Sequence, residues 1–84
     1  MLKLLYFASL RERMGRTEED LVAPADVATV ADLIRHLQRR DPAGAAAFAQ
    51  TSLVRAAVNQ EFAHPQTAIR DGDEIAFFPP VTGG

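Results

Sequence analysis

The sequence contains no cysteine and only two histidines among its 84 residues. Without cysteine, the chain has no disulfides, thiolate metal sites, iron–sulfur clusters or cysteine nucleophile. His36 and His64 lie far apart in the sequence and match no recognised ligand spacing, so we expect no metal site. Ser9 and Ser52 have neither a nearby base nor a glycine-rich elbow. The usual residues of an active site are therefore nearly absent.

A basic excess and a long apolar run are absent as well. Nine Lys and Arg against eleven Asp and Glu give a formal net charge of −2, which argues against a nucleic-acid partner because phosphate binding needs a basic face. The longest uncharged stretch, residues 42–54, is too short and too polar to span a bilayer. Residues 1–10 lack the features of a secretory segment. We therefore expect a cytoplasmic protein with no membrane and no nucleic-acid partner.

The length of 84 residues supports one modest hydrophobic core and not two. We therefore expect residues 1–84 to form a single domain, with residues 79–84 as an extended tail. A core of this size leaves no room for a deep substrate cavity.

Hydrophobic residues make up 48% of the chain, and their periodicity predicts its main helix. This helix is expected over residues 30–40, with Thr29 as its N-cap and Asp32 in the first turn, where the helix dipole favours an acid. Its apolar residues recur at helical spacing and form one stripe. The stripe consists of Val30, Leu33, Ile34 and Leu37.

Apolar runs and turn signals predict the remaining elements. Ser9 is the predicted N-cap of a first short helix, with Glu12 completing a capping box and Gly15 as its left-handed stop. Residues 62–69 are predicted to be mostly irregular. We expect strands over residues 2–8, 17–22, 53–59 and 74–78, short helices over residues 10–14 and 43–50, and turns at Asn59-Gln60 and Asp71-Gly72. One main helix packed on a mixed sheet of four to five strands is an α+β two-layer fold.

Side-chain alternation in the first and last strands predicts an exposed aromatic patch. If Lys3 points away from the core, Phe7 does so too, and the same relation holds for Glu74 and Phe78. Exposed phenylalanines side by side mark an interaction surface. The run of residues 18–20, Glu-Glu-Asp, is expected to be a solvated strand face.

The end of the sequence is unusual, because its last six residues hold four of the ten glycines and prolines. The prolines at 79–80 fix φ and stiffen the chain as it leaves the last strand. Val81 and Thr82 favour extended conformations. The glycines at 83–84 have no Cβ atom and can pass a narrow channel. This composition suits a tail that presents its carboxylate inside the active site of another protein.

A free carboxylate is a poor acyl donor, since attack on it must expel an oxide-like leaving group. Activation by ATP as an acyl-adenylate removes this obstacle, and sulfide transfer would then give a thiocarboxylate. A protein whose reactive group is its own chain end needs no cysteine, histidine or metal.

Residues 71–84, with the sequence DGDEIAFFPPVTGG, resemble the C-terminal motif of the molybdopterin synthase small subunit family. Members of this family are ubiquitin-like sulfur carriers. Residues 4–8 (LLYFA), followed by residues 10–12 (LRE), and residues 56–60 (AAVNQ) also resemble that family. The similarity covers most of the chain and is weakest in the alanine-rich middle. The resemblance implies a ubiquitin-like β-grasp fold, which agrees with the predicted order of elements.

The resemblance also implies the chemistry of Gly84. A ubiquitin-activating-type enzyme would use ATP to adenylate Gly84, and a sulfur-donor protein would supply the sulfur of its thiocarboxylate. Gly84 would then donate this sulfur to cyclic pyranopterin monophosphate and form the dithiolene of molybdopterin, a step of molybdenum cofactor biosynthesis. The chain would be no enzyme by itself and would bind no cofactor or metal.

The implied partner is the large subunit of molybdopterin synthase, in a heterotetramer of two small and two large subunits. The implied tail-insertion residues are Pro80, Val81, Thr82 and Gly83. By position, the family's hydrophobic docking surface corresponds to Phe7, Phe62 and Phe78. Alternation independently places Phe7 and Phe78 outside the core, whereas Phe62 rests on the resemblance alone.

Two other interpretations stay open. The same fold could carry sulfur for thiamine or another pathway, or serve as a ubiquitin-like protein modifier, although residues 77–82 (FFPPVT) favour the molybdopterin branch. The chain could also be a β-grasp binding module whose tail takes part in no chemistry. Deletion of Gly84 separates the binding module from a sulfur carrier, because a binding module would keep its function and a carrier would lose sulfur transfer. Co-purification with a pterin-binding large subunit would separate the molybdopterin branch from the other carriers.

Overall fold

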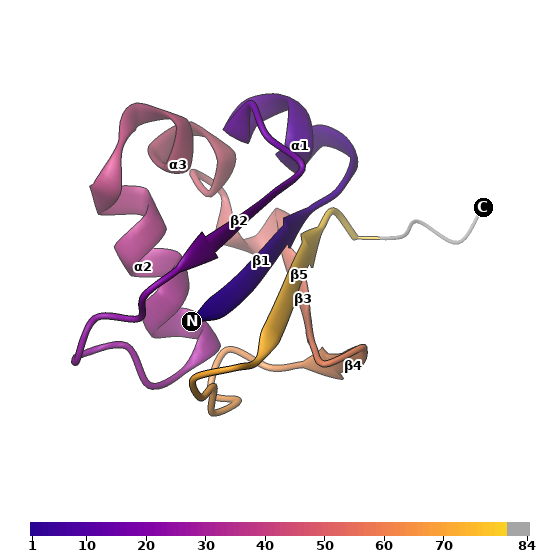
Figure 1. Ribbon diagram of the computed structural model, residues 1–84. Helices are drawn as coiled ribbons and strands as arrows, with labels where there is room; N and C mark the ends of the chain where they lie inside the picture. Colours follow the sequence, from indigo (N-terminus) through magenta and orange to yellow (C-terminus); the bar gives the residue numbers. More distant parts are fainter. Residues whose placement is uncertain (81–84) are drawn as a thin grey trace.

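Five strands form one mixed sheet in the computed structural model, which describes residues 1–80 (Figure 1). The strands are β1 (Leu2–Tyr6), β2 (Glu18–Leu21), β3 (Arg55–Val58), β4 (Glu61–Ala63) and β5 (Glu74–Phe78). The helices are α1 (Ala8–Met14), α2 (Val30–Arg40) and α3 (Pro42–Ala47), and a 3₁₀ turn covers Thr51–Leu53. The order of the strands in the sheet is β2-β1-β5-β3-β4.

β1 and β5 lie side by side and parallel in this sheet, whereas all other strand pairs are antiparallel. In register, Lys3 pairs with Glu74 and Tyr6 pairs with Phe77. The first and last strands of the chain therefore present their side chains on shared faces of the sheet.

α2 spans the residues predicted for it, and local signals explain its start. The Thr29 hydroxyl accepts a hydrogen bond from the Asp32 N–H at 3.2 Å, and the Asp32 carboxylate accepts one from the Thr29 N–H at 3.2 Å. The predicted N-cap is therefore part of a complete capping box. Val30, Leu33 and Leu37 are buried and face the sheet, as the apolar stripe predicts.

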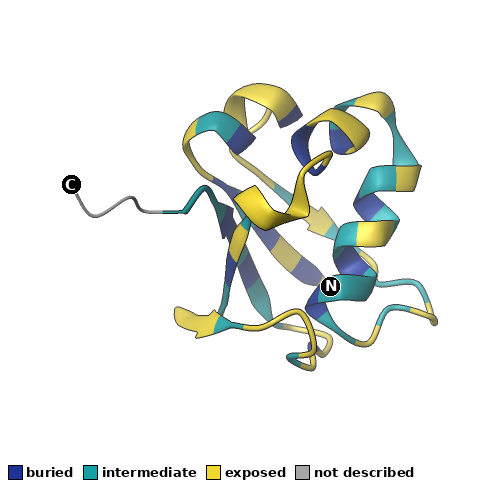
Figure 2. Ribbon diagram, turned by 180° about the vertical axis from the view of Figure 1, so that it is seen from behind, coloured by how far each residue is buried: buried dark blue, intermediate teal, exposed yellow. Residues whose placement is uncertain are grey.

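The hydrophobic core lies between one face of the sheet and the layer of helices, and Figure 2 shows buried positions alternating with exposed ones along the strands. Phe77 is at its centre, with its ring centroid 6.1 Å from that of Tyr6 and 5.1 Å from that of Phe48. The largest fully buried side chains are Tyr6, Phe48, Phe77, Leu2, Leu4, Leu33, Leu37 and Ile75. Within residues 1–80, no helix covers the opposite face of the sheet (Figure 1).

The start of α1 differs from the prediction. Ser9 is not the N-cap, because the helix begins at Ala8 and no side chain caps it. Instead, the backbone carbonyl of Phe7 accepts hydrogen bonds from the N–H groups of Leu10 and Arg11, at 3.1 and 3.4 Å. Ala8 makes this tight entry with a φ of 53°, so the chain turns into the helix directly after the strand.

The end of α1 is as predicted. Gly15 adopts the left-handed conformation with a φ of 73°, and its N–H donates to the Arg11 carbonyl at 3.0 Å. Glycine suits this position because it has no Cβ atom to clash there.

The strand predicted over residues 53–59 is shorter than expected. It begins at Arg55, because residues 51–53 form the 3₁₀ turn, and ends before Asn59, whose φ is 51°. The turn at Asn59 and Gln60 is confirmed, and β4 follows it, partly within the segment predicted to be irregular. The strand predicted over residues 74–78 is confirmed with the same bounds.

Among residues 1–80, no helix combines the length and the apolar composition needed to cross a membrane. The same part of the chain holds no group of three or more His, Cys, Asp or Glu side chains arranged to bind a metal ion.

Candidate functional site

Phe7 and Phe78 lie on the uncovered face of the sheet, as side-chain alternation predicts. Phe7 follows β1 and is 47% exposed, while Phe77, its neighbour in the sheet, is fully buried. Phe78 is the next residue of β5 and therefore points the opposite way from Phe77, where it is half-buried. The expectation of exposed apolar groups at this end of the two strands is confirmed.

Phe62 completes an aromatic surface, defined here as Phe7, Phe62 and Phe78. It stands on β4 and is 86% exposed, an unusual position for a phenylalanine. Its ring centroid lies 6.0 Å from that of Phe78, and the two rings are inclined by 60°, an edge-to-face arrangement. Ala57 on β3 and Ala76 on β5 pair with each other in register. Ala57 also lies opposite Phe62, so these small side chains leave room for the rings.

The aromatic surface lies where the chain leaves the sheet, because Phe78 is the last residue of β5. Figure 1 shows the chain leaving the sheet at this end of β5. The Phe7 N–H donates to the Phe77 carbonyl at 3.1 Å, so the first strand stays paired with the last one up to its end. Pro79 and Pro80 follow and are half-buried. Proline has no N–H to continue the ladder, so the strand stops here. Pro80 is the last predicted tail residue that the structure describes.

The rest of the predicted reactive tail lies outside the described residues. These residues are Val81, Thr82, Gly83 and Gly84. Their predicted roles remain predictions.

Charged side chains share the outer face of the sheet with the aromatic surface. Lys3 pairs with Glu18 at 3.2 Å, and both are more than half exposed. Arg55 pairs in register with Phe78, and its guanidinium donates to the backbone carbonyls of Ser52 and Val54 at 3.0 and 3.2 Å. An apolar centre with a charged rim is the usual arrangement of a protein–protein interface.

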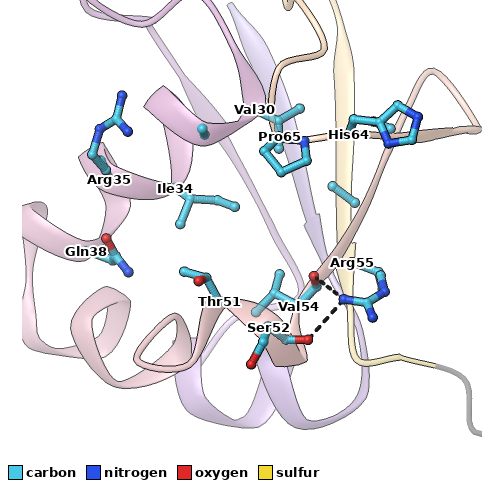
Figure 3. A pocket seen from close by; sticks show the side chains of 13 residues that line it. Val30, Ile34, Arg35, Gln38, Thr51, Ser52, Val54, Arg55, His64 and Pro65 are labelled. Atoms are coloured by element: carbon cyan, nitrogen blue, oxygen red, sulfur yellow. Dashed lines mark hydrogen bonds between the residues drawn. The ribbon is translucent and has the colours of Figure 1, made fainter.

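Apart from the aromatic surface, a concave region of about 610 Å³ lies between α2 and β3 (Figure 3). Its floor is apolar, with Ile34 and Val54, and it opens to solvent instead of forming a deep cavity. Ser52 and His64 both line it, but within residues 1–80 no hydrogen bond joins their side chains. The region therefore has no assembled nucleophile and base.

Glu19 contradicts the prediction that residues 18–20 form one solvated face. Its carboxylate is only 11% exposed and accepts two hydrogen bonds from the Arg40 guanidinium, at 2.7 and 2.9 Å. The Tyr6 hydroxyl donates to the same carboxylate at 2.7 Å. Alternation along β2 explains the difference, because Glu18 and Asp20 point outward while Glu19 points toward the end of α2.

The surroundings of Glu19 shift the pKa of its carboxyl group. Burial acts to raise the pKa of the carboxyl group, but the hydrogen bonds from Arg40 and Tyr6 and the nearby guanidinium charges outweigh it. The pKa of Glu19 therefore lies below its ordinary value. Burial, followed by the hydrogen bond to Glu19, raises the pKa of Tyr6 well above the ordinary range. This network joins β1, β2 and α2 and has a structural role.

A five-stranded mixed sheet of this order, packed on one main helix, defines the ubiquitin-like β-grasp class, so the predicted fold is confirmed. The chain belongs to the ThiS family, whose model matches residues 4–84.

Two relatives and one solved structure place the chain within this family. The molybdopterin synthase sulfur carrier subunit of Escherichia coli is 45% identical over 87 residues, covering 100% of both chains. The protein of the same description in Haemophilus influenzae is 39% identical over 84 residues, again covering 100% of both. The crystal structure of small archaeal modifier protein 1 of Haloferax volcanii is 27% identical, covers 95% of this chain and 97% of its own, and has a TM-score of 0.73. The predicted family and the predicted sulfur-carrier function are confirmed.

Proposed function

We propose that Gly84 carries the sulfur atom that molybdopterin synthase transfers. An activating enzyme of the ubiquitin-activating type joins the Gly84 carboxylate to AMP from ATP. Pyrophosphate leaves in this step. Sulfide supplied by a sulfur-donor protein then attacks the acyl carbon and displaces AMP, which leaves a thiocarboxylate at Gly84. The chain itself binds no cofactor in this scheme, since ATP is the substrate of the activating enzyme.

The observation that supports this function best is the position of the aromatic surface at the root of the tail. Phe7 directly follows β1 and Phe78 ends β5, and Pro79 and Pro80 continue the chain from β5. Residues 79–84 can reach at most about 20 Å when extended. A large subunit that binds the aromatic surface would therefore meet the tail within a short distance, and its active site would lie within that reach.

The tail residues have distinct roles in this proposal. Pro80 directs the chain away from the sheet, because its fixed φ stiffens the exit. Val81 and Thr82 line the channel of the large subunit, and Gly83 gives clearance next to the reactive carbon. The thiocarboxylate of Gly84 then donates sulfur to cyclic pyranopterin monophosphate, and two such transfers complete the dithiolene of molybdopterin.

The relatives in E. coli and H. influenzae are described as subunits of molybdopterin synthase, which supports a complex with a large subunit. We propose a heterotetramer of two small and two large subunits, with Phe7, Phe62 and Phe78 at each interface. The chain is then one subunit of a sulfurtransferase and not an enzyme alone. A cytoplasmic location fits a supply of ATP and reduced sulfur and remains a prediction.

Deletion of Gly84 tests the carrier role. The shortened chain should bind the large subunit with an unchanged Kd, because the aromatic surface is intact, yet it should give no molybdopterin when incubated with the activating enzyme, ATP, a sulfur donor and the pterin substrate. A shortened chain that still supports molybdopterin formation would contradict the role of Gly84.

The structural likeness to a small archaeal modifier protein favours a second candidate function, attachment to other proteins. In that case, the activated Gly84 would form an amide bond with a lysine amino group. Mass spectrometry of lysine adducts after incubation with the activating enzyme and ATP, with and without the sulfur donor, separates the two functions.

A further inference from the structure

Of the three phenylalanines in the aromatic surface, Phe62 is held in place least firmly by the sheet. It stands on β4, which has three residues and lies at the edge of the sheet. Within residues 1–80, β4 pairs with β3 alone, and Phe62 lies opposite Ala57. A short edge strand of this kind holds its position only if the hairpin that carries it is held.

The hairpin depends on a two-residue turn at Asn59 and Gln60. Their φ angles are 51° and 71°, both in the left-handed region, as a type I′ turn requires. Asparagine tolerates this conformation better than other residues except glycine, because its short side chain can bond to nearby backbone.

Asn59 also makes three hydrogen bonds to the start of β5. Its N–H donates to the Glu74 carbonyl at 2.8 Å, and its side-chain oxygen accepts from the Glu74 N–H at 3.0 Å. Its side-chain nitrogen donates to the Asp73 carboxylate at 3.0 Å. The side-chain oxygen thus takes the place that the backbone carbonyl has in a regular hydrogen-bonded pair of an antiparallel ladder.

These bonds tie the β3–β4 turn to the start of β5, next to the β3–β5 ladder that ends at the Val58–Ile75 pair. β3 leads through Asn59 into β4 and Phe62, while Glu74 begins β5, which ends at Phe78. The geometry points to Asn59 as a positioning residue, which holds the hairpin on β5 so that Phe62 and Phe78 present one edge-to-face pair to the large subunit. This inference rests on the proposed function of the aromatic surface.

Asn59 meets three requirements that few side chains combine. It adopts a positive φ, it accepts from Glu74 and it donates to Asp73. Glycine would meet only the first requirement. Aspartate would tolerate the turn and accept from Glu74, but it would place a second carboxylate against Asp73.

The bond to Asp73 has a measurable consequence. The Asn59 hydrogen bond, together with the Arg70 N–H that donates to the other carboxylate oxygen at 2.8 Å, holds the pKa of the Asp73 carboxyl below its ordinary value. Charged residues near this pair include Arg70 and Glu61, Glu74, whose N–H donates to Asn59, and Lys3, whose N–H donates to the Asp73 carbonyl at 3.0 Å. NMR titration of Asp73 therefore reports whether the Asn59 contact forms in solution.

The first experiment compares Asn59→Gly with Phe62→Ala and with Gln60→Gly as a matched control. Gln60→Gly stays in the same turn and accepts its positive φ, so its Kd for the large subunit should equal that of the wild type. Asn59→Gly should raise the Kd about tenfold. It should also abolish the NOE contacts between the rings of Phe62 and Phe78 while the remaining amide spectrum stays folded.

The same variants separate positioning from chemistry. In single-turnover sulfur transfer from the thiocarboxylated carrier, Asn59→Gly should need more large subunit for half-maximal rate, yet reach the wild-type rate at saturation. A loss of the saturated rate with an unchanged Kd would contradict a positioning role.

Asn59→Asp adds a readout that general destabilisation would not show. At neutral pH its carboxylate would repel that of Asp73, so its Kd should be at least as high as that of Asn59→Gly. As the pH falls, one proton shared by the two carboxyl groups restores a hydrogen bond. The ratio of the Asn59→Asp Kd to the wild-type Kd, measured at the same pH, should then fall. The same ratio for Asn59→Gly should stay constant.

The outcomes distinguish this inference from the function on which it rests. If Phe62→Ala weakens binding and Asn59→Gly leaves the Kd within about twofold of the wild type, the positioning role is wrong and the docking surface stands. If Phe62→Ala also has no effect, the docking surface itself is wrong, and the role of Asn59 fails with it.

Discussion

Glu19 and Arg40 form a two-point ion pair between the edge strand β2 and the end of α2, with nitrogen–oxygen distances of 2.7 and 2.9 Å. The Tyr6 hydroxyl, from the neighbouring strand, donates to the same carboxylate at 2.7 Å. The pair lies on the side of the sheet opposite the aromatic surface. It therefore stabilises the scaffold without entering the proposed interface.

Glu19→Gln should lower the free energy of unfolding by about 2 kcal/mol, because it removes the charge of a largely buried, hydrogen-bonded pair. Chemical denaturation at neutral pH measures this difference. Glu18→Gln is the matched control, since Glu18 is exposed and, within residues 1–80, its one ion pair is with the exposed Lys3. It should change the free energy of unfolding by less than about 1 kcal/mol.

The effect of Glu19→Gln should depend on pH. The pKa of Glu19 in the folded protein lies below its ordinary value of 4.5. Its contribution to stability is therefore fully present above pH 4.5 and is lost as the pH falls through the lowered pKa of the folded state. The difference between wild type and variant should shrink in that acidic range, and a difference that stays constant there would contradict the assignment.

Gly44→Ala should destabilise the fold by about 2–3 kcal/mol, because the site has no space for a methyl group. A Cβ atom on Gly44 would overlap the carbonyl oxygen of Leu37 and stand 2.7 Å from its carbonyl carbon. Thermal or chemical unfolding measures the loss. Ala46→Gly, at an exposed position of the same helix, should cost about 1 kcal/mol or less. Equal effects of the two substitutions would show that α3 does not pack against α2 in this way.

Phe62→Ala should leave the stability nearly unchanged, because the side chain is 86% exposed, yet weaken binding to the large subunit by about 2 kcal/mol. Val22→Ala is the control, since Val22 is 72% exposed but lies beyond β2, away from the aromatic surface. It should change neither quantity. Isothermal titration calorimetry with the large subunit and denaturant unfolding of the free chain measure both.

Much of the fold could be predicted because the strongest signals are local. The helix over residues 30–40 carries its own capping box and stripe, and the last strand is bounded by a turn and two prolines. Ser9 was wrongly expected to cap α1, because the chain leaves β1 through a left-handed Ala8, and a capping pattern in the sequence does not show where a strand ends.

Long-range contacts account for what the sequence could not show. Glu19 pairs with Arg16 nearby in the sequence, but Arg40, which forms the two-point ion pair, lies 21 residues away, and nothing near Glu19 in the sequence identifies it. Alternation explains the outward position of Phe7 and Phe78. The position of Phe62 depends on the β3–β4 hairpin, whose turn residue Asn59 adds hydrogen bonds to the β3–β5 ladder. The turn at Asn59 was predictable, whereas its bonds to Asp73 and Glu74 were not.

The central claim is that Gly84 accepts the sulfur atom. Intact-mass spectrometry of the chain after incubation with the activating enzyme, ATP and a sulfur source tests it most directly, with the Gly84 deletion as the control. The account predicts a mass increase equal to the exchange of one oxygen atom for one sulfur atom, located at Gly84 by fragmentation and absent from the deletion variant. An unchanged mass of the full chain, under conditions in which ATP is consumed, would contradict it.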